Sequence, residues 1–94
     1  MVRKQSKKYK IGILRNPTTV KSLAKEIITA SDQYISRLMD EQEYRELIIY
    51  FATYHGKKLF STNASLNPTI KNRIGLKRCS LVELMLVGFQ VSII

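Results

Sequence analysis

The chain has 94 residues, with 16 lysines and arginines against 7 aspartates and glutamates, and a formal net charge of +9 at pH 7. Its hydrophobic fraction of 45% and charged fraction of 24% are typical of a globular protein and exclude a disordered chain. The length fits one domain with an ordinary core. We expect residues 1–8 to form a basic mobile arm and residues 9–94 a single helical domain.

The sequence gives no indication of secretion or of a membrane span. The lone cysteine, Cys79, cannot close an intramolecular disulfide, and the first residues are basic and polar, unlike a signal peptide. The most apolar segment, residues 81–94, has 14 residues and contains Glu83 and Gln90, so it is too short and too polar to cross a bilayer. We therefore expect a cytoplasmic protein.

The positive charge lies in two blocks that flank a mildly acidic one. Residues 1–15 and residues 47–78 each carry six cations and no acid, whereas residues 16–46 carry four cations and six acids. Such asymmetry favours a polyanionic partner, with nucleic acid ahead of an anionic membrane surface. The alternative is that the charge serves solubility alone.

Asn16-Pro17-Thr18 is typical of a helix start, with Asn as N-cap and Pro at the first helical position. Apolar residues then recur at three- and four-residue steps as far as Met39, which predicts one amphipathic helix over 17–39. An alternative is a DNA-binding helix-turn-helix over residues 20–38. Against it, Ile28 stands where that motif has a glycine, and a β-branched residue is strained in the left-handed turn conformation.

Residues 40–55 are predicted to form the central buried helix. Asp40 with Glu43 resembles a capping box, Gly56 is placed to end the helix, and six contiguous apolar residues from Leu47 to Ala52 cover all of its sides. A strand is the competing interpretation, because β-branched and aromatic residues are enriched there.

The remaining chain predicts a loop over 57–66 and two further helices. Asn67-Pro68 repeats the cap chemistry and starts a helix over 68–74 that ends at Gly75, and a last helix covers about 77–87, beginning near Leu76 or at Ser80. The fold class is thus mainly α, a compact bundle of four helices. A small two-stranded ribbon, formed by the alternating segments 9–14 and 89–93 near the two ends, is an additional hypothesis.

The candidate binding residues are the six cations of the second basic block, four of which surround the predicted turn at Gly75. Together they would contact phosphates and give affinity without sequence choice. The alternative is a solvated corner of a helical hairpin. The candidate nucleic-acid-binding residues are Lys57, Lys58, Lys71, Arg73, Lys77 and Arg78.

Catalytic, metal and cofactor sites are not expected. One histidine, His55, and one cysteine, Cys79, cannot make a structural zinc site, and they are far apart for a nucleophile pair. The four glycines form no phosphate-binding loop, and no small-molecule ligand is evident. We expect no enzyme.

The stretches NPTTVKSLAKEI (16–27), HGKKLF (55–60), LNPTIKNRIGLKR (66–78) and LVELMLVGFQ (81–90) resemble a family of small uncharacterised bacterial proteins. The resemblance covers about residues 16–90 and implies no activity, partner or site. From the residues we expect a small non-enzymatic protein that associates with DNA or RNA through phosphates. The alternative is an interaction module, a homodimer or adaptor, that buries the apolar segment 81–94 in a partner.

Overall fold

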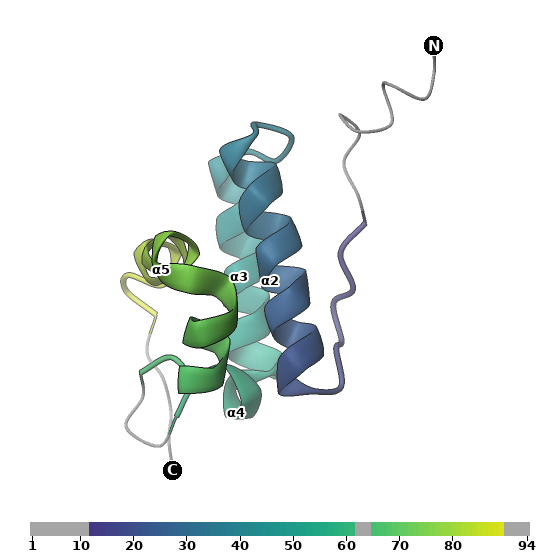
Figure 1. The fold of residues 1–94 in the computed structure, drawn as a ribbon. Helices are drawn as coiled ribbons and strands as arrows, with labels where there is room; N and C mark the ends of the chain where they lie inside the picture. The colour runs from purple at the N-terminus through teal and green to yellow at the C-terminus, as the bar shows by residue number, and fades with distance from the viewer. Residues whose placement is uncertain (1–11, 62–64, 90–94) are drawn as a thin grey trace.

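The computed structural model describes residues 12–61 and 65–89. Four helices follow one another, α2 (Val20–Ile35), α3 (Glu41–Tyr54), α4 (Gly56–Leu59) and α5 (Pro68–Met85). Figure 1 shows α2 and α3 as an antiparallel pair, with α5 packed across them and α4 where α3 ends. The predicted mainly helical bundle is confirmed. The lone backbone bridge in the described ranges, Phe60 with Leu66, closes the loop between α4 and α5.

The core lies where α2, α3 and α5 meet, and the most extensive contact joins α2 to α5. Because apolar residues at three- and four-residue steps share one face of a helix, each of these helices has a buried stripe. The buried residues of these three stripes include Leu23, Ile27, Ala30, Tyr44, Leu47, Ile48, Phe51, Ile70, Ile74, Val82 and Met85.

The prediction that residues 40–55 form a helix buried on every side is correct for the helix and wrong for its burial. Asp40 caps α3, since its Oδ1 accepts the backbone N–H of Glu43 at 2.8 Å. Ile49 and Tyr50 are only half-buried, however, and Tyr54 is 67% exposed. The apolar run is therefore partly a surface against which other chain segments lie.

The first helix is shorter at both ends than the predicted range 17–39. It begins at Val20, because Thr19 and Ser22 form a reciprocal capping box, with Ser22 N–H donating to Thr19 Oγ1 at 3.0 Å. Asn16 is drawn away as a partner for α3: its Oδ1 accepts from the hydroxyl of Tyr50 at 3.0 Å and from His55 Nε2 at 3.2 Å. Tertiary contacts thus displaced the expected cap.

The C-terminal end of α2 is a Schellman turn built on an arginine. Arg37 has φ of 68°, in the left-handed region, and Leu38 N–H donates to the carbonyl of Gln33 at 2.8 Å. Glycine usually takes this position, and because the chain has an arginine there, the sequence did not indicate that the helix ends at this point. The helix passes without a break through Ile28, so the helix-turn-helix interpretation of residues 20–38 is wrong.

Gly75 divides α5 into two helical segments, as predicted. Its φ of 85° and ψ of 167° are open to glycine and strained for other residues. Asn67 and Pro68 start the first segment, where Asn67 Oδ1 accepts from Thr69 N–H at 2.8 Å. The second segment continues through Ser80 and ends at Met85. Gly56 follows the His55 cap of α3, as expected, and also opens the short α4, which falls partly in the predicted loop 57–66.

The proposed ribbon falls largely on residues 9–11 and 90–94, which lie outside the described residues. The described parts of its two segments, 12–14 and 89, contain no strand. Within the same described ranges, none of the helices has the length and hydrophobicity needed to cross a bilayer.

The bundle has two ends with different composition. The foot comprises residues 15–28, 50–59 and 67–75, where α2 and α5 begin and α3 ends. The hairpin end comprises residues 31–46, where α2 turns into α3. In Figure 1 the foot is at the bottom of the molecule and the hairpin end is at the top.

Candidate nucleic-acid interface

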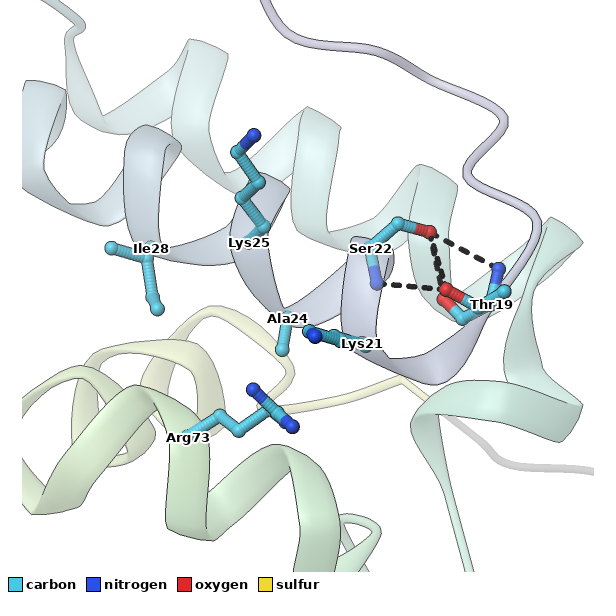
Figure 2. A pocket seen from close by; sticks show the side chains of 7 residues that line it. All are labelled: Thr19, Lys21, Ser22, Ala24, Lys25, Ile28 and Arg73. Carbon is cyan, nitrogen blue, oxygen red and sulfur yellow. Dashed lines mark hydrogen bonds between the residues drawn. The ribbon is translucent and has the colours of Figure 1, made fainter.

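A groove at the foot separates α2 from the first segment of α5. It has a volume of about 510 Å³ and is lined by Thr19, Lys21, Ser22, Ala24, Lys25, Ile28 and Arg73. Figure 2 shows Arg73 reaching from α5 toward Ala24 and Lys21, while Lys25 points away from α5 at the rim. Three cations and no carboxylate thus surround one hollow.

The single carboxylate in the first half of α2 is turned away from this groove. Glu26 is 8% exposed, and its Oε1 accepts the backbone N–H of Leu14 at 3.0 Å. The side chain thereby fastens the segment that precedes α2. Its charge is engaged on that side, so Lys21, Lys25 and Arg73 make no ion pair in the part of the chain that the structure describes.

The hydroxyls in the groove are already committed. Thr19 Oγ1 donates to Ser22 Oγ at 2.9 Å, and Ser22 Oγ accepts the backbone N–H of Thr19 at 3.1 Å. Their hydrogen-bonding capacity stabilises the start of α2. The chemistry left for a ligand is therefore cationic around the rim and apolar at Ala24 and Ile28.

Of the six predicted site residues, Arg73 is the one that lines this groove. Lys57 and Lys58 lie on α4, and the carbonyl of Lys58 accepts from Asn67 Nδ2 at 3.2 Å, which places α4 beside the start of α5. Lys71 and Lys77 are exposed on the two segments of α5. Gly75 lies between Lys71 and Arg73 on the first segment and Lys77 and Arg78 on the second.

Arg78 is held by the protein itself. Its Nε donates to Asp32 Oδ1 at 2.9 Å, its Nη2 to Oδ2 at 3.1 Å, and its Nη1 to the carbonyl of Ile74 at 2.9 Å. The hydrogen bond to Asp32 raises the pKa of Arg78 above its ordinary value. Three of its N–H directions are occupied, so Arg78 has less to offer a phosphate than Arg73 has.

Sequence reasoning missed Lys21 and Lys25. They lie in the block whose acids outnumber its cations, and a charge count over that block hides them. The available clue was their spacing of four residues, which puts two cations on one helical face with no acid between them. What no spacing could show is that they line the same groove as Arg73.

His55 and Cys79 have structural surroundings. His55 Nε2 donates to the carbonyl of Arg15 at 2.9 Å and lies beside Tyr50, whose ring carries the Arg15 guanidinium 5.2 Å from its centroid. Cys79 is buried, and burial, followed by the nearby Glu83, raises the pKa of its thiol. No group of three His, Cys, Asp or Glu side chains in the described ranges is arranged to hold a metal ion.

The model of a family described as conserved hypothetical protein matches residues 14–87. The chain belongs to this family. The match covers α2 to α5 and therefore the groove, and it confirms the resemblance to small uncharacterised bacterial proteins. No curated protein and no solved structure matches the chain.

Proposed function

We propose that this member of the family binds the phosphate backbone of nucleic acid at its foot. The observation that carries the proposal is the groove lined by Lys21, Lys25 and Arg73, with no carboxylate among its lining residues. Cations that contact phosphates release condensed counterions, so affinity falls steeply as salt is added. Lys57, Lys58 and Lys71 extend the same positive region along α4 and α5, and the basic residues 1–8 add to the attraction.

The contrast with the hairpin end supports this choice of surface. Asp32 at that end pairs with Arg78 of α5, and Glu41 pairs with Arg45. A cation that already has a carboxylate partner gains less from a phosphate, because binding must first break the existing pair. The foot, whose groove cations have no carboxylate partner among the described residues, is the better place for a polyanion.

The test is binding of labelled duplex DNA, single-stranded DNA and RNA across a salt series. Arg73→Gln should reduce the slope of log affinity against log salt by about one. Arg37→Asn removes the same charge at the hairpin end, and asparagine tolerates the left-handed backbone there, so this matched control should leave the slope unchanged. Absence of binding to all three probes at low salt would contradict the proposal.

A second candidate, an interaction module, rests on apolar side chains exposed by the C-terminal part of the described chain. Leu76 is 90%, Leu84 54% and Val87 72% exposed. Such side chains on a small domain are candidates for burial in a homodimer or an adaptor complex. Sedimentation across a concentration series should then show a dimer that Leu84→Gln weakens, whereas a monomer at all concentrations contradicts the homodimer.

A further inference from the structure

The groove has a partly exposed apolar side chain, Ile28, that phosphates alone would leave uncovered. Ala24 is 1% exposed and Ile28 is half-buried, and both line the hollow between Lys21 and Arg73. Figure 2 shows the Ile28 side chain at one end of the groove and the capping pair of Thr19 and Ser22 at the other. A ligand that fills the groove must therefore bring carbon atoms as well as negative charge.

The duplex form of nucleic acid does not present that combination. Its phosphates lie on the outside while its bases are stacked and paired inside, so a duplex resting on the three cations leaves Ile28 facing water. An unpaired nucleotide presents a base and a sugar together with the phosphates on either side of them. The groove volume of about 510 Å³ is in the range of pockets that enclose a small molecule.

We propose that the groove accepts one unpaired nucleotide of a single-stranded nucleic acid. The base or sugar lies against Ile28, and the flanking phosphates lie against Lys21 and Arg73, with Lys25 at the rim. This inference rests on the proposed function and narrows it, because it gives the foot a preference for single strands that phosphate contacts alone do not create.

The deciding comparison uses the full-length chain and two single-stranded probes of equal length, an oligothymidylate and the same backbone with abasic sugars in place of every nucleoside. The two probes carry the same number of phosphates, so they differ only in the bases. We expect the intact strand to bind more tightly by on the order of tenfold, the effect of removing a modest apolar area from water. The pair is repeated with RNA backbones.

A variant then assigns the difference to the groove. Ile28→Gln should bring the affinity for the intact strand down toward that for the abasic strand, and should leave the abasic affinity unchanged. Ile35→Gln is the matched control, because Ile35 is also a partly exposed isoleucine of α2 but lies at the hairpin end. The probe comparison needs no variant, so it remains decisive even if Ile28→Gln impairs folding.

Equal affinity of the intact and abasic strands would overturn the inference. If that equal binding still weakens with Arg73→Gln, the proposed phosphate binding stands and only the nucleotide preference fails. Binding of neither probe, nor of a duplex, at low salt would overturn the proposed function and this inference together.

Discussion

Asp32 and Glu41, at the hairpin end of the bundle, are each paired with an arginine, whereas the groove cations of the foot have no such partner among the described residues. Arg78 donates hydrogen bonds to both carboxylate oxygens of Asp32. Arg45 donates to Glu41 Oε2 at 3.4 Å and to the carbonyl of Met85 at 3.2 Å. At the foot, Lys21 and Arg73 share a groove with no carboxylate. The comparison teaches that the pairing of cations, rather than their number along the chain, distinguishes side chains that hold the fold from those that are available to a ligand.

Gly75 joins the two segments of α5, and replacing it should give the largest loss of stability. Gly75→Ala forces a side chain into a backbone conformation that suits glycine, although the added methyl would meet no atom within 4 Å. We expect the free energy of unfolding to fall by about 1–3 kcal/mol in chemical denaturation. Gly56→Ala is the control: φ at Gly56 is not positive, and its nearest contact would be an ordinary 3.8 Å, so stability should be unchanged or slightly higher. Equal losses in both variants would contradict this role of Gly75.

The buried hydrogen bond at the hairpin end should give the next largest effect. The hydroxyls of Ser31 and Tyr44 are 2.7 Å apart, and both residues are fully buried. Tyr44→Phe leaves the Ser31 hydroxyl without this partner, so we expect the free energy of unfolding to fall by about 1–2 kcal/mol in urea melts. Tyr54→Phe, at an exposed position of the foot, should change it by much less. A neutral Tyr44→Phe would show that the bond contributes nothing.

The same tyrosine makes stability depend on pH in the alkaline range. Burial raises the pKa of Tyr44 from 10.0 to about 12, so the folded protein keeps a proton that the unfolded chain releases. Its contribution is fully present below pH 10 and is lost as the pH rises from there through about 12. Urea melts across this range should show a steeper decline for the wild type than for Tyr44→Phe. Parallel declines would contradict the assignment to Tyr44.

One charge-removing substitution at each end should distinguish an effect on stability from an effect on nucleic-acid binding. Asp32→Asn weakens the grip on Arg78, and we expect a loss of about 1 kcal/mol in stability, because the pair is partly exposed. Nucleic-acid affinity should not decrease. Arg73→Gln should do the reverse, with unchanged unfolding and weaker binding. A loss of stability in Arg73→Gln as large as that in Asp32→Asn would mean that the foot cations are structural as well.

The sequence alone predicted the helix boundaries that are set by residues at the boundary itself. Asp40 before α3, Asn67-Pro68 before α5 and Gly75 within it each act through neighbours two to three residues away or through their own backbone freedom. The errors arose where distant contacts decided the outcome. Asn16 bonded to Tyr50 and His55 instead of capping a helix, and Arg37 took a left-handed conformation that residue type alone disfavours.

In the candidate site, too, the sequence predicted what depends on local spacing and missed what depends on distant contacts. Sequence spacing located a basic stretch around Gly75, and within it Arg73 lines the groove. The partner of Arg78 lies 46 residues earlier in the chain, and the lysines that line the groove with Arg73 lie in a block with more acids than cations. Which cations are paired and which share a surface depends on the packing of α5 against α2, and no local pattern carries that information.

The most direct test of the foot as the binding surface is the change of backbone amide NMR signals when an oligothymidylate is added at low salt. We predict that the largest shifts fall in residues 19–28 and 70–76, on the two sides of the groove, and that they fade as salt is raised. Shifts that are largest in residues 31–46 or 80–87, or an unchanged spectrum, would contradict binding at the foot.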